Sequence, residues 1–590
     1  MQVVKRDGSI EEFNVDKIIS AVEKAFKSCN KKMPQYLYDM LGALFGTLEG
    51  DTIGIEEIQN KVEDVLMNDK HFDVAKSYII YREQHKQARF IRERIDYMNE
   101  YSQSNENAAT SSETDANANV TMKNVANLEG EVYKTTNRVI QRQRMKDKLN
   151  EMYPEVAKKY EEDLNSHVIY THDEATTPVL KQYCMAVSLY PLMMEGVGNI
   201  DGITPTPPND LQSFSGQVTN LIFLLSSQCK GAVAVGEYFI ALNYYIVQEF
   251  GPNWYEKLDV VTTTDHCSKQ RTVRDAIYKA FKQFIYGVNQ PAGNRSYQSP
   301  FTNVSYYDHT YFDSLFGEFY YPDGTKPQWE AVDCLQRLFM KFFNKLRTKQ
   351  ILTFPVETMA MVYDPKTNDI IDKDYKDFTA EMYAEGHSFF TYISDSADSL
   401  ASCCRLRNEL AENTFNPTSG LTGVMTGSCN VITLNINRIV QDWIKSPLTP
   451  DELDSGEEWA NKFKQYLIPI LERVYKYHIA FKTMLYDLED KGMFAASNGG
   501  YIHISKLYST IGINGLNEAA RFLGMTVGNN KEYIEFLQLV LGTIKEQNKI
   551  HSIHDANRPF LFNSEVVPAE GLGGKNYNWD KEDGLEPMSI

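Results

Sequence analysis

Apolar and polar positions divide the chain into two blocks of different character, joined by a polar stretch. In the first block, residues 1–95, a short hairpin signal with an Asp-Gly turn at positions 7–8 precedes helical spacings such as that of residues 55–62. Residues 96–122 are dominated by Ser, Asn, Ala and Thr over most of their length, a composition typical of a linker. We therefore predict a small, mostly helical domain with a β-hairpin, a linker, and a large domain over residues 123–590.

The large block has a mixed pattern. Helical stretches alternate with short β-rich runs, among them residues 168–170, 351–354 and 430–434. Strands that alternate with helices are typical of α/β architectures, in which helices cover a mainly parallel sheet. The predicted class for this domain is therefore α/β.

Composition and charge narrow the functional classes. The formal net charge is −19, and an acidic surface disfavours nonspecific binding of nucleic acid or of anionic membranes. The N-terminus has no apolar signal-peptide core, and no run reaches the roughly 18 apolar residues of a transmembrane helix. The eight cysteines are scattered and form no Cys-x-x-Cys pair, so the sequence predicts neither a disulfide scaffold nor a metal site. We expect a cytoplasmic protein without nucleic-acid or membrane partners.

The N-terminal hairpin offers a candidate nucleotide site. Triphosphates are bound by cationic side chains and by backbone N–H groups held at a turn. Lys5 and Arg6 stand beside the Asp-Gly turn, and Lys17 lies on the helix predicted to follow. The alternative is a solvated hairpin with surface cations, which charge alone favours.

The order of features in the first block resembles the ATP-cone, a regulatory module found mainly on ribonucleotide reductases and on their transcriptional repressor. The resemblance runs from VKRDGSIEEFNVDKI through IEEIQNKVEDVL to AKSYIIYREQHKQAR. It implies ATP and dATP as allosteric effectors. The residues that it places at the adenine-nucleotide site are Val4, Lys5, Arg6, Glu11, Asn14, Lys17 and Gln59, the last standing where many cones have a histidine.

Two stretches of the large block carry reactive groups. His172 and Asp173 follow a predicted strand and precede Cys184, and the vicinal pair Cys403 and Cys404 lies beside arginines. Nearby positive charge favours the thiolate form and hence reactivity of a cysteine. Each stretch has a structural alternative, a core histidine in the first case and two small buried residues in the second.

A third stretch, from Thr426 to Ser428, precedes the predicted strand over residues 430–434. Its hydroxyl groups and backbone N–H groups suit a phosphate. A plain turn before a strand would have the same sequence.

The order of the motifs along the chain resembles the anaerobic (class III) ribonucleoside-triphosphate reductases, which are glycyl-radical enzymes. The motifs that carry the resemblance are IYTHDEATTPVLKQYC, NRSYQSPFTNVS, ILTFPVET, SCCRLRNEL, GSCNVITLNI and TIGINGLNEAA. The resemblance implies a ten-stranded α/β barrel that is entered by a finger loop with the radical cysteine at its tip. It also implies reduction of ribonucleoside triphosphates to deoxyribonucleoside triphosphates by thiyl-radical chemistry under anaerobic conditions.

The same resemblance assigns roles to residues. Cys404 matches the radical cysteine, and Cys184 matches the second cysteine, on the first barrel strand. Glu357 is an acid that would act as a general base toward the ribose 3′-hydroxyl. The expected substrate contacts are His172, Asp173, Asn303, Ser305, Thr426, Gly427, Ser428, Asn430 and Asn435, of which residues 426–428 would contact phosphate.

Partners and cofactors also follow from the resemblance. It implies a radical-SAM activase, a redoxin or formate as reductant, and a homodimer or a higher oligomer with dATP. Ser305, where formate-oxidising members tend to have Asn, and Glu357, where some relatives have a neutral amide, favour a redoxin. The family's four-cysteine zinc site and radical-bearing glycine motif are not found after Cys429. We expect both on a segment that is not present in this sequence.

Two other functions are alternatives. Another glycyl-radical enzyme of the formate-lyase type would share the barrel and the cysteine pair but would have no evident use for an ATP-cone. A catalytically incomplete nucleotide-sensing subunit would share the cone. A DNA-binding regulator fits the acidic charge poorly.

Overall fold

The computed structural model describes most of the chain. The described ranges are 2–4, 10–46, 52–103, 125–197, 206–264, 270–291, 299–397, 399–402, 406–409, 415–416, 420–449, 457–567 and 570–587. The chain divides into two compact units, Met1–Asn105 and Glu106–Ile590, which are described separately. None of the described helices combines the length and the apolar character needed to cross a membrane.

The N-terminal unit packs helices and a small sheet around an apolar centre. Its elements are β1 (Gln2–Val4), β2 (Ile10–Glu12), α1 (Val15–Ser28), α2 (Gln35–Gly46), β3 (Thr52–Gly54), α3 (Ile55–Asn68) and α4 (Phe72–Gln103). β1 pairs antiparallel with β2 and parallel with β3, which confirms the predicted hairpin. The apolar spacing of the helices brings Val22, Leu41 and Val62 into one core.

The last helix of this unit is longer than the sequence predicted. α4 continues to Gln103, so residues 96–103, predicted to belong to the linker, are helical. The rings of Tyr97 and Tyr101, one helical turn apart, lie 6.4 Å from each other and support this last part of the helix. The Ser- and Asn-rich composition that signalled a linker begins only near the end of α4.

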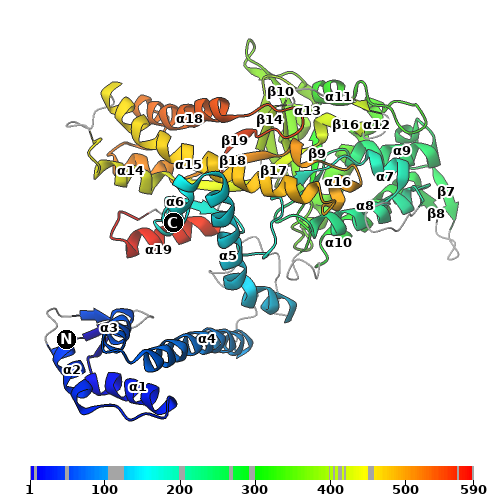
Figure 1. Cartoon of the computed structure of the whole chain (residues 1–590). Helices are drawn as coiled ribbons and strands as arrows, with labels where there is room; N and C mark the ends of the chain where they lie inside the picture. The colour runs from blue at the N-terminus through cyan, green and yellow to red at the C-terminus, as the bar shows by residue number, and fades with distance from the viewer. Residues whose placement is uncertain are drawn as a thin grey trace. The chain divides into compact units, whose positions relative to one another are not determined.

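The C-terminal unit is an α/β domain built on one large sheet (Figure 1). Its helices are α5 (Val125–Met152), α6 (Pro154–Asn165), α7 (Tyr190–Glu195), α8 (Leu211–Ser226), α9 (Tyr238–Phe250), α10 (Val273–Val288), α11 (His309–Phe316), α12 (Trp329–Arg347), α13 (Lys373–Ala384), α14 (Ile436–Ile444), α15 (Glu457–Glu489), α16 (Ala495–Asn498), α17 (Leu516–Phe522), α18 (Lys531–His551) and α19 (Glu570–Glu582). Its strands are β4 (Ile169–Thr171), β5 (Cys184–Ala186), β6 (Val233–Val235), β7 (Val261–Thr264), β8 (Gln270–Thr272), β9 (Thr302–Tyr307), β10 (Val356–Asp364), β11 (Asp369–Ile370), β12 (Phe390–Ser394), β13 (Ser399–Ser402), β14 (Leu406–Glu409), β15 (Phe415–Asn416), β16 (Gly420–Leu421), β17 (Thr426–Asn435), β18 (Tyr508–Asn514) and β19 (Phe562–Val566).

The central sheet has ten strands, eight of which form two parallel sets, while β11 and β4 pair antiparallel with β10 and β17. Their order is β11-β10-β9-β6-β5-β17-β18-β19, with β12 paired to β10 and β4 paired to β17. Strands β5, β6, β9, β10 and β12 run parallel to one another, as do β17, β18 and β19. The halves meet antiparallel where β5 pairs with β17. Within the described residues the hydrogen-bonded path leaves the two ends of this sheet unjoined.

The two faces of the sheet differ in chemistry. On β9, Val304 and Tyr306 point toward the helices, and the ring of Tyr306 stacks on Phe239 of α9 at 5.1 Å. Because side chains alternate along a strand, Asn303 and Ser305 point to the opposite face. We call the helix-covered face the outer face and the other the inner face.

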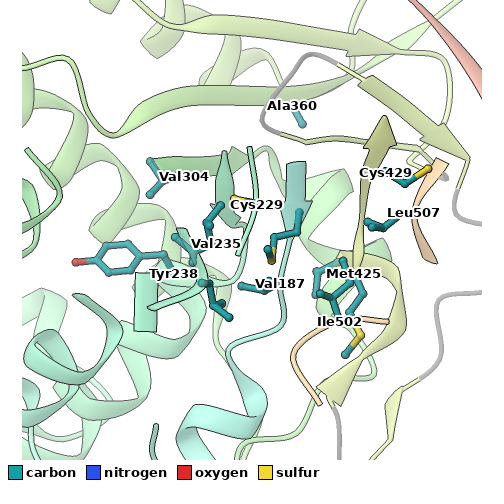
Figure 2. Close-up of a cluster of buried hydrophobic side chains, with 14 of the residues drawn as sticks. Val187, Cys229, Val235, Tyr238, Val304, Ala360, Met425, Cys429, Ile502 and Leu507 are labelled. Atoms are coloured by element: carbon teal, nitrogen blue, oxygen red, sulfur yellow. The ribbon is translucent and has the colours of Figure 1, made fainter. Parts of the chain in front are cut away.

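Helices cover the outer face of both halves. α8 lies against β6, while α14 and α15 lie against β17 and α18 lies against β19 (Figure 1). Figure 2 shows part of the resulting core, where Val235 and Val304 of the first half lie near Tyr238 of α9. The apolar outer face provides most of the packing, so the inner face is free to carry polar side chains.

A hairpin of β13 and β14 contacts strands from both halves of the sheet. Its pairs run from Ser399 with Glu409 to Ser402 with Leu406. β13 contacts β10, and β14 contacts β17 and β19. The hairpin therefore extends from one half of the sheet to the other.

Candidate active site

Cys184 begins β5 at the junction of the two half-sheets, opposite Ser428 of β17. It is 1% exposed. The backbone N–H of Ala232 donates a hydrogen bond to its Sγ at 3.3 Å. A Cβ added to Gly231 would lie 2.5 Å from the same sulfur, so the thiol can occupy this position only because residue 231 is glycine.

Gly427 makes the second close approach to this cysteine. Its φ is +152°, and an added Cβ would lie 2.3 Å from the carbonyl oxygen of Cys184. Both the backbone conformation and the lack of space exclude a side chain. Gly427 therefore allows β17 to approach β5 and fixes the junction that carries Cys184.

Hydrogen-bonded polar side chains cover the inner face on both sides of the junction. Ser428 Oγ and Thr510 Oγ1 are 2.9 Å apart, and the Thr510 hydroxyl donates to Asn563 Oδ1 at 2.9 Å. In the other half, Asn303 Nδ2 donates to Thr358 Oγ1 at 2.9 Å. The inner face thus presents hydroxyl and amide groups, as a site for a polar small molecule requires.

Some buried acceptors near this face lack a partner. Asn303 Oδ1 and Gln182 Oε1 are buried and accept no hydrogen bond from any described residue, and the same holds for Asn430 Oδ1 beyond the bulge in β17. An unsatisfied buried acceptor costs about 1–3 kcal/mol. A ligand that offers hydroxyl or amino donors would remove this penalty.

His172 and Asp173 follow β4. His172 Nε2 lies 2.8 Å from Thr433 Oγ1, which holds the imidazole against β17. Asp173 has a φ of +50°, a conformation uncommon for residues other than glycine. Burial lowers the pKa of Lys230 to about 8, and the negative charges of Asp173 and Glu174 oppose this effect.

Glu357 does not reach the inner face. Its carboxylate accepts hydrogen bonds from the Tyr306 hydroxyl at 2.5 Å and from Arg347 of α12 at 2.8 Å, both of them on the outer face. Burial raises the pKa of Glu357 to about 7, against the opposing effects of Arg347 and Tyr306. Its neighbour Thr358 occupies the inner face. This geometry contradicts the prediction that Glu357 is a general base inside the barrel, because the register of β10 with β9 turns the carboxylate outward.

Asn435 has a structural role that the sequence did not reveal. It ends β17 and caps α14, where its Oδ1 accepts the backbone N–H of Arg438 at 3.1 Å. Ser305 and Thr426 are buried. The substrate contacts expected of these residues stay predictions.

The predicted radical cysteine lies outside the described residues. Cys404 falls between Ser402 and Leu406, the innermost pair of the β13–β14 hairpin. In the described part of the chain, no cluster of His, Cys, Asp or Glu side chains is arranged to hold a metal ion.

Part of the predicted nucleotide site in the N-terminal unit can be placed. Lys17 Nζ lies 3.2 Å from Glu11 Oε2, so the structure brings these two residues together. Asn14 caps α1 by accepting the backbone N–H of Asp16 at 2.8 Å, and Gln59 is half-buried on α3. Lys5, Arg6 and the side chain of Val4 lie outside the described residues.

Several residues of the inner face were not found from the sequence. They are Thr358, Thr433, Thr510 and Asn563, together with Gly231 beside Cys184. None belongs to a motif with recognisable spacing. The one signal was a polar residue at alternate positions of an otherwise apolar strand, which also occurs on solvent-facing strands.

Sequence comparisons match the N-terminal and the C-terminal part of the chain to two different families. The family described as anaerobic ribonucleoside-triphosphate reductase matches residues 124–585, and the ATP cone domain matches residues 1–87. The anaerobic ribonucleoside-triphosphate reductase of Haemophilus influenzae is 36% identical over 96 residues, which are 16% of this chain and 14% of that protein. The vitamin B12-dependent ribonucleoside-diphosphate reductase of Thermoplasma acidophilum is 42% identical over 105 residues, 16% of this chain and 13% of that protein. These matches thus span about one seventh of the relatives' length.

Solved structures resemble a larger part. The anaerobic ribonucleotide reductase from Thermotoga maritima in complex with dATP and CTP has a TM-score of 0.63 and 26% identity, and the match covers 78% of this chain and 72% of that one. The same enzyme with dATP bound in the specificity site has a TM-score of 0.64 and 25% identity over the same shares. The predicted α/β fold of the glycyl-radical type is confirmed. The chain belongs to the anaerobic ribonucleoside-triphosphate reductase family and carries an ATP cone at its N-terminus.

Proposed function

We propose that this chain reduces ribonucleoside triphosphates to deoxyribonucleoside triphosphates by thiyl-radical chemistry. One observation carries the proposal. The hairpin that brackets Cys404 contacts β10, β17 and β19, while Cys184 lies buried at the junction of the same sheet. One cysteine in the segment that joins the two strands of this hairpin and a second on β5 suit a reaction with one radical-forming and one reducing thiol.

The chemistry assigns a step to each group. A thiyl radical on Cys404 removes the hydrogen atom from the ribose 3′ carbon, and the 2′-hydroxyl leaves as water. Cys184 then supplies a hydrogen atom to the 2′ carbon, because an S–H bond is weak and sulfur changes oxidation state reversibly. Its sulfur joins a thiolate of the proposed redoxin in a disulfide, which releases the one electron that, with a proton, reduces the 3′ ketone. Cys404 finally returns its hydrogen atom to the 3′ carbon and becomes the thiyl radical again. Asn303, with an unsatisfied buried acceptor, is suited to a ribose hydroxyl.

Phosphate and base contacts come from the remaining predicted residues. Thr426, Gly427 and Ser428 are the first three residues of β17 and pair with β5 at Cys184. They are proposed to contact phosphate through hydroxyl and backbone N–H groups. His172, Asp173, Ser305, Asn430 and Asn435 are proposed as further polar contacts. Glu357 has no part in this proposal, because its carboxylate faces α12.

Partners and effectors complete the proposal. ATP and dATP are proposed to bind the N-terminal unit, where Glu11 and Lys17 lie together. A glycyl radical installed by a radical-SAM activase would generate the thiyl radical, and zinc is expected near that glycine. A redoxin is the proposed reductant, with formate as the alternative, and a homodimer or larger dATP-dependent oligomer is the proposed assembly.

The test uses cysteine variants under anaerobic conditions. Chain supplied with the activase, the radical-bearing segment and a thioredoxin system should convert CTP to dCTP, and Cys404→Ala and Cys184→Ala should each abolish the product. Cys334→Ser is the matched control, because Cys334 is a free, half-buried thiol on α12. Product formation by the Cys404→Ala variant would refute the proposal.

A nucleotide-sensing subunit without catalysis is the second candidate. It predicts that ATP and dATP bind to the chain while no CTP binds to the C-terminal unit. Calorimetric titration with each nucleotide separates the two functions without any need for the radical.

A further inference from the structure

The loop between β4 and β5 joins residues on which the proposed function depends. It begins with His172 and ends at Cys184. Over this fully described stretch, strand pairing is limited to an isolated bridge between Gln182 and Cys229. Contacts from outside the loop must therefore fix its conformation, because few backbone bonds of its own restrain it.

Helix α5 supplies such contacts through two buried amides. Asn137 Nδ2 donates to the carbonyl oxygen of Ala175 at 3.1 Å. Gln141 Nε2 donates to the carbonyl oxygens of Thr177 and Val179. Asn137 and Gln141 lie one turn apart on the buried face of α5. Together these two side chains hold the loop backbone at Ala175, Thr177 and Val179.

An ion pair holds the start of the same loop. Arg142 donates twice to Glu174 Oε1, at 2.8 Å from Nε and 2.5 Å from the terminal nitrogen, and Arg138 lies 3.6 Å from the same oxygen. The side chain of Glu174 is 10% exposed. Because Glu174 directly follows Asp173, this ion pair acts one residue from a proposed substrate contact.

Gln141 also connects the loop to the strand beside Cys184. Lys230 donates from Nζ to Gln141 Oε1 at 3.3 Å and packs over the ring of Phe481. Lys230 precedes Gly231, whose lack of a side chain makes room for the Cys184 sulfur. Both ends of the loop are therefore tied to the same face of α5.

We propose that Asn137, Gln141 and Arg142 are positioning residues that set the loop from His172 to Cys184 and thereby the affinity for the substrate triphosphate. This inference rests on the proposed function. An apolar face would have packed α5 equally well, whereas amides bonded to specific carbonyls define one position of the loop. α5 is a continuous helix of 28 residues that starts at Val125. A displacement of its first turn would therefore be transmitted along the helix to the three positioning residues and to the loop that they hold.

The test compares two arginine variants in the full chain. Arg142→Gln removes the doubly bonded pair with Glu174. Arg473→Gln is the matched control, because Arg473 of α15 donates to Asp163 of α6 at 2.9 and 2.8 Å in an equivalent pair away from the loop. Calorimetry with CTP should show a loss of affinity of about fivefold or more for Arg142→Gln and none for Arg473→Gln. Arg142→Lys, which keeps the charge, should recover part of the affinity.

Hydrogen exchange gives a readout that does not depend on the substrate. Peptides covering residues 172–183 should exchange faster in Arg142→Gln and in Asn137→Ala, and at the parental rate in Arg473→Gln. CTP affinity within twofold of the parent together with unchanged exchange in Arg142→Gln would overturn the inference, and so would an equal loss in the control. If the parent chain binds no ribonucleoside triphosphate, the proposed function fails, while the exchange data still decide whether α5 positions the loop.

Discussion

Replacement of Gly427 by alanine tests the geometry of the junction directly. The new Cβ would lie 2.3 Å from the Cys184 carbonyl oxygen, where ordinary contacts begin at 3.4 Å, so β17 and β5 must separate by about 1 Å. A residue held at such a φ costs about 1–3 kcal/mol, and overpacking adds about 1–3 kcal/mol. The expected loss of about 2–6 kcal/mol is a large share of the stability of an ordinary domain.

The measurement combines thermal unfolding with turnover. Gly427→Ala should unfold at a clearly lower temperature, and a displacement of about 1 Å at Cys184, the proposed reducing cysteine, should lower kcat about 100-fold. Gly542→Ala is the control, since that glycine lies in α18 with nothing within 4 Å of an added Cβ, and alanine should stabilise the helix by up to about 1 kcal/mol. A Gly427→Ala variant with parental melting temperature and turnover would refute the reasoning.

Three further predictions concern other parts of the chain. Arg438→Met should cost about 3–5 kcal/mol, because it leaves the fully buried carboxylate of Asp580 unpaired, and limited proteolysis should then cleave α19 earlier than in the parent. Because the pKa of Glu357 is raised from 4.5 to about 7, the native state binds this proton more tightly than the unfolded chain. The parent should therefore lose stability relative to Glu357→Gln as pH rises through that window, with no further change above it, as thermal unfolding at several pH values would show. Lys17→Ala should weaken ATP binding several-fold without changing CTP binding, because Lys17 is a cation of the proposed ATP site. Titration calorimetry with ATP and with CTP measures both affinities, and an equal loss for the two nucleotides would mean that Lys17 acts only through stability.

The sequence predicted elements better than it predicted which way their side chains face. The two-block organisation, the N-terminal hairpin and the strand over residues 430–434 all appear in the structure, because each depends on a local pattern, whereas the turn expected at residues 426–428 is the first part of β17. The end of α4 is not predicted because residues 96–103 include Asp, Asn and Ser, whose helix propensity is weaker than that of Met, Glu or Gln, and they lead directly into the Ser- and Asn-rich run.

The error on Glu357 has a different origin. Glu357 and Thr358 are adjacent polar residues in one strand, so one of them must face the inner side, and their order gives no preference. The choice is made by the pairing of Glu357 with Val304, a contact between residues far apart in the sequence. The hydroxyl of Tyr306 and the guanidinium of Arg347 then make the outer position tolerable for a carboxylate.

The position of Cys184 depends on a departure from regular pairing beside the junction, between β5 and β6. β17 pairs regularly with β5 from Thr426 to Ser428, whereas its register with β18 is irregular between Ser428 and Asn430. On the other side, the N–H of Ala232 donates to the cysteine sulfur instead of to a strand carbonyl. A regular ladder would use that N–H for the sheet and would leave no donor for the thiol. The N–H of Ala232 therefore supplies the hydrogen bond, and the missing side chain of Gly231 supplies the space, that hold the sulfur at the inner face.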